Sequence, residues 1–195
     1  KTLLMEVLSA IAFNGELIMN HTESVIFRDI SNNLITMFID EVEQLSKRDK
    51  DTYGSLISLL NSGFNKAGVV KRSEATGQGG FVVKAYSAYS PKMFAGISEI
   101  DDVLQDRTVR IPLLRKKDAE TTQRYKGTPE ILELQRSIRD DLYVFALTYA
   151  KDLAEFYHKE GPDGIEGLSH LNNRELDIWE PVFLLANVID SLANG

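Results

Sequence analysis

The sequence contains no cysteine, which excludes disulfide bonds and thiolate metal sites. Its three histidines, His21, His158 and His170, are too widely separated to match a metal-binding motif, so we expect no structural metal. No segment approaches the roughly 20 apolar residues that a membrane-spanning helix requires. The first residues also lack the basic segment, apolar run and cleavage site of a secretory leader. We therefore expect a soluble, cytoplasmic protein with no membrane partner.

Positive charge is scarce overall but concentrated in one region. The net charge is −7 over 195 residues, which argues against a protein coated with nucleic acid. Between Ser62 and Lys92, however, basic residues outnumber the single acid, Glu74; they are Lys66, Lys71, Arg72, Lys84 and Lys92. The middle of the chain is therefore the part expected to face an anion. A hydrophobic content of 43% is sufficient for one core, with or without a small second domain.

Apolar periodicity predicts alternating helices and strands in the first part of the chain. Helices are predicted over 2–13, 22–30 and 53–60, and strands over 16–19, 34–39, 93–97 and 109–114. The run 34–39 is almost continuously apolar, which is typical of a strand buried on both faces of a parallel sheet. The segments 93–97 and 109–114 are predicted to be further buried strands.

A β-hairpin and a helical tail complete the expected fold. The β-prone segments 68–72 and 81–86 flank a tip that contains Gly77, Gly79 and Gly80, which predicts the hairpin. Apolar residues at three- and four-residue spacing predict helices over 131–158 and 176–192. We therefore expect an α/β nucleotide-binding core with a hairpin insertion over residues 1–117. A small all-helical lid domain is expected over residues 118–195.

The acidic pair Asp40-Glu41 directly follows the buried strand 34–39. Ligand sites of open α/β sheets lie at the carboxyl ends of the strands. In a P-loop enzyme, an aspartate at that position holds Mg2+ and the next glutamate orients the attacking water. The alternative interpretation is an acidic pair that merely ends a strand at the surface.

Lys1-Thr2 opens the first predicted helix and matches the last two residues of a phosphate-binding loop. In that motif the lysine reaches the phosphates and the hydroxyl binds Mg2+. The order of Lys1-Thr2, helix, strand, helix and then Asp40-Glu41 is the order that such a fold requires. We therefore expect the chain to begin inside its own phosphate-binding loop, and we expect ATP and Mg2+ as its cofactors. The alternative is that two common residues stand at this position by chance.

Four further segments resemble successive motifs of a poorly characterised AAA+-like family. They are Leu60-Asn-Ser-Gly-Phe-Asn-Lys66, Tyr89-Ser-Pro-Lys-Met-Phe-Ala-Gly-Ile97, Leu104-Gln-Asp-Arg-Thr-Val-Arg-Ile111 and Leu171-Asn-Asn-Arg-Glu-Leu-Asp-Ile-Trp-Glu-Pro181. Members of this family are often the ATPase half of phage- and plasmid-type primase-helicase proteins. The resemblance covers most of the chain, and the last segment is its most specific part.

The resemblance implies a role for individual residues. Asp40 and Glu41 would be the Walker B pair, and Arg107 would be an arginine finger donated to a neighbouring subunit, with Arg110 as the alternative finger. Arg174 would be the sensor 2 arginine, although Glu175 and Asp177 are candidate ion-pair partners for it. Such proteins usually carry Asn or Thr after the strand that corresponds to 93–97. The nearest candidate here is Ser98, a departure that puts the rate of hydrolysis in doubt.

The resemblance also implies how such an ATPase acts. It predicts a homo-oligomeric ring, with a hexamer as one candidate, which works as a DNA helicase or translocase. The hairpin would enter the channel of the ring, where Lys71, Arg72 and Lys84 would contact DNA phosphates without reading sequence. The alternative for the hairpin is a solvated element whose aromatic residues pack inward. The alternatives for the protein are a nucleotide-dependent switch or loader and a non-enzymatic scaffold for DNA or protein.

Overall fold

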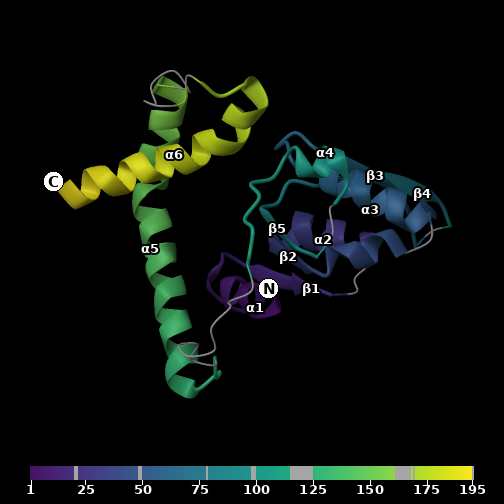
Figure 1. Cartoon of the computed structure of the whole chain (residues 1–195). Coiled ribbons are helices and arrows are strands. Elements are labelled where there is room, and N and C mark those ends of the chain that lie inside the picture. Colours follow the sequence, from purple (N-terminus) through teal and green to yellow (C-terminus); the bar gives the residue numbers. More distant parts are fainter. Residues whose placement is uncertain are drawn as a thin grey trace. The chain divides into compact units, whose positions relative to one another are not determined.

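The computed structural model describes residues 1–19, 22–47, 50–77, 79–97, 100–114, 125–160, 168 and 170–194 (Figure 1). The chain divides into two compact units. Unit 1 comprises Lys1–Asp106 and Ile111–Arg139, and unit 2 comprises Arg107–Arg110 and Asp140–Gly195. The predicted domain boundary between residues 117 and 118 lies outside the described residues and stays a prediction.

Unit 1 is built on a small parallel sheet. The strands β1 (Gly15–Ile18), β2 (Thr36–Asp40) and β5 (Lys92–Ala95) lie in the order β1-β2-β5, and both neighbouring pairs are parallel. Parallel neighbours need crossover connections, which the intervening segments provide. The helical elements between Lys1 and Asp106 are α1 (Thr2–Ile11), α2 (Glu23–Asn33), η1 (Val42–Lys47), α3 (Lys50–Ser62) and α4 (Asp102–Gln105). The predicted α/β class is confirmed for this unit.

The core of unit 1 lies around the central strand. Met37, Phe38 and Ile39 of β2 are all buried, as the apolar run predicts for a strand covered on both faces. Phe27 of α2 and Leu56 of α3 are each 1% exposed and belong to the same cluster of buried side chains as Met37. This packing fixes the direction of β2 and therefore the position of the acidic residues at its end.

The predicted hairpin is confirmed and forms a separate two-stranded sheet. Its strands β3 (Val69–Ala75) and β4 (Phe81–Ser87) are antiparallel, and Gly79 in the turn has a φ of 83°, a conformation that glycine tolerates. Val70 and Tyr86 lie opposite each other, and Tyr86 packs against Phe27 with ring centroids 4.8 Å apart. One face of the hairpin therefore packs against α2.

The predicted buried strand over 109–114 is wrong. These residues form no strand, and Val109, Ile111, Leu113 and Leu114 are between 40% and 92% exposed. An apolar run becomes a buried strand only if another strand supplies ladder hydrogen bonds, and no described strand pairs with this segment. Pro112 also removes one backbone donor. The short helix α4 was not predicted, and its cap is the Asp101 carboxylate, which accepts a hydrogen bond from the Leu104 amide at 3.2 Å.

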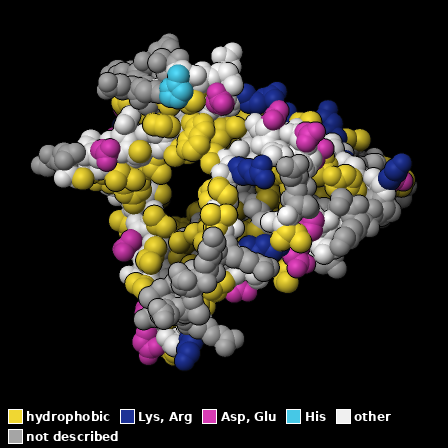
Figure 2. Space-filling view, viewed as in Figure 1, with side chains coloured by type: hydrophobic (Ala, Val, Ile, Leu, Met, Phe, Trp, Pro, Cys, Tyr) yellow, Lys and Arg dark blue, Asp and Glu magenta, His cyan; other side chains and the backbone are white. Residues whose placement is uncertain are grey.

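Unit 2 contains two long helices, as predicted. They are α5 (Pro129–Glu160), whose first part belongs to unit 1, and α6 (Asn173–Asn194). Leu168 and Leu184 are buried and pack with Leu153 and Phe156. Many other apolar side chains of the two helices remain exposed, and Figure 2 shows them gathered over α5 and α6. No helix in the described ranges combines the length and the apolar character needed to span a bilayer.

Candidate functional site

The structure brings Lys1 and Thr2 to Asp40, although 38 positions separate Thr2 from Asp40. Thr2 is the first residue of α1, and Asp40 is the last residue of β2. The Thr2 hydroxyl donates a hydrogen bond to Oδ2 of Asp40 at 2.5 Å, and Nζ of Lys1 lies 3.4 Å from Oδ1. The helix α1 packs on β1 and β2, so its N-terminus reaches the carboxyl end of the sheet. The sequence assigns these three residues to one nucleotide site, and in the structure they are in contact; their roles stay predictions.

Asp40 is the centre of this arrangement. Its side chain is only 9% exposed. Burial alone would raise its pKa, but the hydrogen bonds from Thr2 and from the amide of Glu41, together with the charge of Lys1, hold the pKa below its ordinary value. The carboxylate therefore stays charged at neutral pH in a position with little access to water.

Glu41 has an unusual backbone conformation. Its φ is 52°, in the left-handed region that a non-glycine residue seldom occupies, and its amide donates to Oδ1 of Asp40 at 2.8 Å. Its side chain is exposed. Strained backbone of this kind is concentrated at functional sites, because the surrounding structure must hold it in place. The left-handed conformation ends the extended strand after Asp40, and the Asp40 side chain is nearly buried whereas that of Glu41 is exposed.

Glu43 belongs to the same cluster, and sequence reasoning missed it. One of its oxygens lies 3.6 Å from Nζ of Lys1, and the other accepts a hydrogen bond from the Ile97 amide at 3.3 Å. Burial raises its pKa, but hydrogen bonds from its own amide and from Ile97, with the charge of Lys1, leave the pKa below its ordinary value. Its place in the first turn of η1, three residues after Asp40, was the available signal. We call Lys1, Thr2, Asp40, Glu41 and Glu43 the Thr2–Asp40 cluster.

The remaining residues predicted for the nucleotide site are Ser98, Arg107, Arg110 and Arg174. Ser98 lies outside the described residues. Arg107, Arg110 and Arg174 all belong to unit 2, whereas Asp40 belongs to unit 1. Their predicted roles therefore stay predictions.

Arg174 lies at the start of α6, in an N-terminal cap. Oδ1 of Asn172 accepts hydrogen bonds from the amides of Arg174 and Glu175, and the Glu175 carboxylate accepts one from the Asn172 amide at 2.9 Å. This reciprocal pair is a capping box. The segment that carries the most specific part of the family resemblance is thus also the start signal of the helix.

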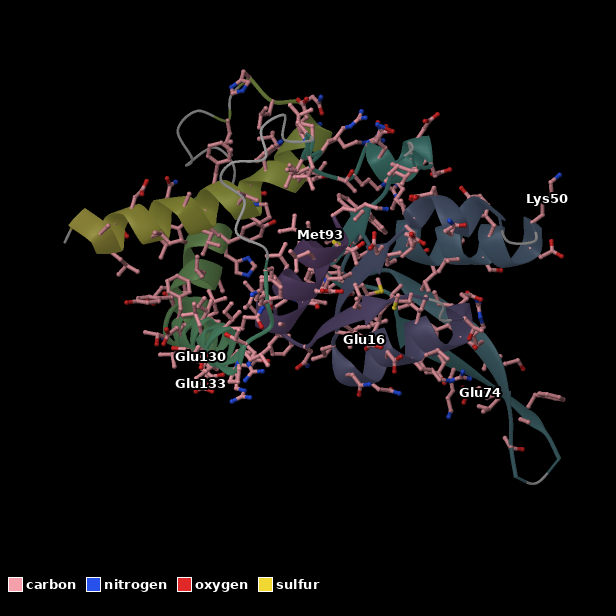
Figure 3. The ribbon with its side chains drawn as sticks, turned by 60° about the horizontal axis from the view of Figure 1, so that its bottom comes forward. Glu16, Lys50, Glu74, Met93, Glu130 and Glu133 are labelled. Carbon is pink, nitrogen blue, oxygen red and sulfur yellow. The ribbon has the colours of Figure 1, made fainter. Side chains whose placement is uncertain are left out.

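Two of the three basic residues predicted to contact DNA are paired with acids of unit 1. Arg72 forms an ion pair with Glu23 of α2, and Lys84 lies 2.8 Å from Glu74. Glu74 also accepts hydrogen bonds from Arg28 and Tyr86. Hydrogen bonds from Lys84, Tyr86 and Arg28 lower its pKa to about 2. Figure 3 shows Glu74 on the hairpin, nearer to the body of the unit than the tip is.

Lys71 differs from the other two basic residues. It alternates with Val70 and Arg72, which face α2, so it lies on the opposite face of the hairpin. It is exposed, and no described acid forms an ion pair with it. Of the three predicted phosphate contacts, only Lys71 therefore presents an uncompensated charge.

No group of three or more His, Asp or Glu side chains in the described ranges is arranged to hold a metal ion by itself. Comparisons of the chain with protein-family models, with curated proteins and with solved structures find no match. The geometry of the Thr2–Asp40 cluster is therefore the feature of this chain that bears most directly on function.

Proposed function

We propose that this chain is the ATP-hydrolysing module of a P-loop protein of the AAA+ type. The observation that supports the proposal most strongly is the hydrogen bond between the Thr2 hydroxyl and Asp40. It joins the first turn of a helix to the carboxyl end of the central parallel strand, which is where open α/β sheets bind ligands. A lysine at the same point, Lys1, adds the positive charge that a phosphate-binding loop places there.

The residues of the cluster fit a Mg2+ ion that is shared with a nucleotide. In ATPase sites Mg2+ takes one or two protein oxygens and completes its shell with water and phosphate oxygens. Thr2 and Asp40 offer one hydroxyl and one ionised carboxylate within 2.5 Å of each other, and no larger ligand set is needed. When bound, Mg2+ neutralises charge on the transferred phosphoryl group. Asp40 and Thr2 are the residues that would hold it.

Lys1, Glu41 and Glu43 divide the remaining tasks. Lys1 binds the phosphates through its ammonium group, and Glu43 keeps that group beside Asp40. Glu41 is exposed next to Asp40, so its carboxylate is the group that orients a water molecule and accepts its proton. The nearly buried Asp40 is left to the binding task.

Assembly supplies the other catalytic groups in this proposal. Arg107, or Arg110 in its place, is donated to the γ-phosphate of the neighbouring subunit in a ring, and Arg174 senses the nucleotide from the lid. Ser98 stands where the water-positioning residue of the family is found. An arginine that arrives in trans makes turnover depend on protein concentration.

DNA is the partner that the family resemblance favours, and a cytoplasmic helicase or translocase is the corresponding activity. Lys71 is the hairpin residue best placed for phosphate contact, because Arg72 and Lys84 are neutralised by Glu23 and Glu74. A hairpin with one uncompensated charge binds DNA weakly. Between the two alternatives to a motor, the ionised carboxylate of Asp40 at the strand end favours a nucleotide-dependent switch or loader over a scaffold, because a scaffold requires no such group.

Steady-state ATP turnover by the full-length protein tests the proposal. Glu41→Gln should abolish turnover and leave ATP binding intact, whereas Glu155→Gln, an exposed change in α5, should leave both unchanged. Specific activity that rises with protein concentration and with single-stranded DNA supports the motor. Turnover that is independent of both supports the switch. Unchanged turnover in Glu41→Gln removes Glu41 from the mechanism.

A further inference from the structure

A polar groove separates α3 from the hairpin strand β3. Its volume is about 440 Å3, and it is lined by residues of α3, by Val69–Arg72 of β3 and by Glu23 of α2. Figure 1 shows α3 alongside β3. The lining includes four consecutive residues of β3, Val69–Arg72, whereas a sheet face would contribute only alternate residues. The groove therefore lies against the edge of the strand.

The hydrogen bonds at the two ends of the hairpin show which backbone groups point into this edge. The Ala88 amide donates to the Gly68 carbonyl at 3.0 Å, and the Thr76 amide donates to the Gly80 carbonyl at 2.8 Å. Directly opposed antiparallel residues alternate between hydrogen-bonded and non-hydrogen-bonded pairs. The even-numbered residues of β3 therefore bond to β4, and the odd-numbered ones direct their backbone groups outward: Val69, Lys71, Ser73 and Ala75.

No described strand pairs with the outer edge of β3. A two-stranded hairpin with such an edge offers a row of backbone donors and acceptors to another extended chain. The Lys71 carbonyl accepts a hydrogen bond from the Arg72 guanidinium at 3.0 Å, which satisfies one of these groups. Of the outward residues, Val69 and Lys71 belong to the lining of the groove, so their amides are the ones directed toward it.

The opposite wall of the groove is made of small residues. Gly54, Ser55 and Ser58 of α3 are exposed, and a Cβ atom added to Gly54 would meet no atom within 4 Å. Leu59 and Val70 are buried at the floor. One strand residue occupies about 3.3 Å of length, about 4.8 Å of width and about 10 Å between layers, so the groove holds about three residues of an added strand.

Charge identifies the kind of strand that fits. Arg72 is paired with Glu23, so Lys71 is the charged residue of the lining that no described partner neutralises. We propose that the α3–β3 groove binds an extended peptide segment of a partner protein, which adds to β3 as a third strand and places small side chains toward α3 and a carboxylate beside Lys71. This recognition mode takes its affinity from main-chain hydrogen bonds and its specificity from the side chains of the lining. It shares Lys71 with the proposed DNA contact but uses no residue of the Thr2–Asp40 cluster, so its failure would leave the proposed ATPase site untouched.

The test is amide hydrogen exchange of the 195-residue chain with the peptide Ac-Ser-Val-Asp-Val-Ser-amide, in the absence of nucleotide. At about ten times Kd, exchange at Val69, Lys71 and Ser73 should slow by about tenfold, whereas Val70 and Arg72 should change little. A peptide with proline in place of both valines should not bind, because it lacks the corresponding amide donors. Equal slowing at odd and even residues, or no binding below about 1 mM, would overturn the proposal.

Variants distinguish the groove from other surfaces. Ser58→Leu should abolish binding by filling the groove, and Ser137→Leu, on the exposed surface of α5, should not. Lys71→Glu should weaken binding of this aspartate-containing peptide by about two- to fivefold and should favour binding of a peptide with lysine in place of the aspartate. Full binding by Ser58→Leu would refute the site.

Other occupants give different results in the same experiment. Slowed exchange at the odd residues without peptide, increasing with protein concentration, would assign the edge to a second copy of the chain. Displacement of the peptide by a decathymidine strand, with loss of the alternating pattern, would assign the groove to DNA. Either result would overturn the peptide proposal.

Discussion

Phe27 joins α2 to the hairpin, and its replacement by leucine tests how that connection is stabilised. The ring is 1% exposed and lies 4.8 Å from the ring of Tyr86, and the guanidinium groups of Arg28 and Arg72 lie 5.1 and 5.4 Å from its centroid. Leucine keeps the site apolar but removes the aromatic face. The stability lost in this variant therefore measures the specific contacts of the ring apart from the ordinary burial of an apolar side chain.

The expected loss follows from these contacts. The aromatic pair contributes about 0.5–1.5 kcal/mol. Each cation–π contact adds about 0.5 kcal/mol, because both guanidinium groups are partly exposed. The smaller side chain leaves a partial cavity worth about 1 kcal/mol. Phe27→Leu should therefore lower the stability of unit 1 by about 2.5–3.5 kcal/mol, from the sum of these terms.

Native-state hydrogen exchange of the β2 amides is the appropriate assay, because it reports on unit 1 alone. The fluorescence of Trp179, the single tryptophan, reports on α6 in unit 2 instead. The control is Ile30→Val, which removes one methyl group from another fully buried residue of α2 and should cost about 0.5–1.5 kcal/mol. The reasoning is refuted if Phe27→Leu costs no more than this control.

Three further changes test particular features of the fold. Leu34 ends α2 with a φ of 50°, a conformation that favours glycine. Leu34→Gly should therefore stabilise unit 1 by about 0.5–1 kcal/mol in thermal unfolding. The control Leu147→Gly lies inside α5 and should destabilise that helix by about 1 kcal/mol. Burial, with repulsion from Asp177, raises the pKa of Glu180. The stability of the wild type relative to Glu180→Gln should therefore fall as the pH rises above 4.5. A stability difference that does not vary with pH would refute this. Burial lowers the pKa of Lys92 to about 8. Between pH 8 and 10.5 the unfolded chain therefore binds more protons than the folded chain, so the stability of the wild type relative to Lys92→Met should rise across this range. Urea unfolding at several pH values in the range is the measurement.

The sequence was sufficient to predict elements whose signal is local. Neighbouring residues alone specify three such features: the apolar run 34–39, the glycines of the hairpin tip, and the apolar periodicity of α5 and α6. The same reasoning failed for 109–114. Burial of a strand depends on a partner elsewhere in the chain, and an apolar pattern does not reveal whether that partner is present.

The candidate site was predictable in part for a similar reason. Motif order brought together Lys1, Thr2 and Asp40, because helix and strand lengths determine where each element ends. Glu43 and the ion pairs of Arg72 and Lys84 were missed, because they depend on tertiary contacts with Lys1, Glu23 and Glu74. Positive charge in the sequence therefore overstated the positive charge that the hairpin presents to a ligand.

The most direct test of the proposed ATPase site is Mg2+-dependent nucleotide binding by two matched variants of the full-length protein. Thr2→Val and Thr36→Val each remove one hydroxyl, the first from the bond to Asp40 and the second from a bond to the Phe13 carbonyl at the other end of β2. Calorimetric titration with ATP, with and without Mg2+, should show that Thr2→Val loses the contribution of Mg2+ to affinity while Thr36→Val retains it. Equal Mg2+ dependence in both variants would contradict the assignment of Thr2 and Asp40 to a nucleotide site.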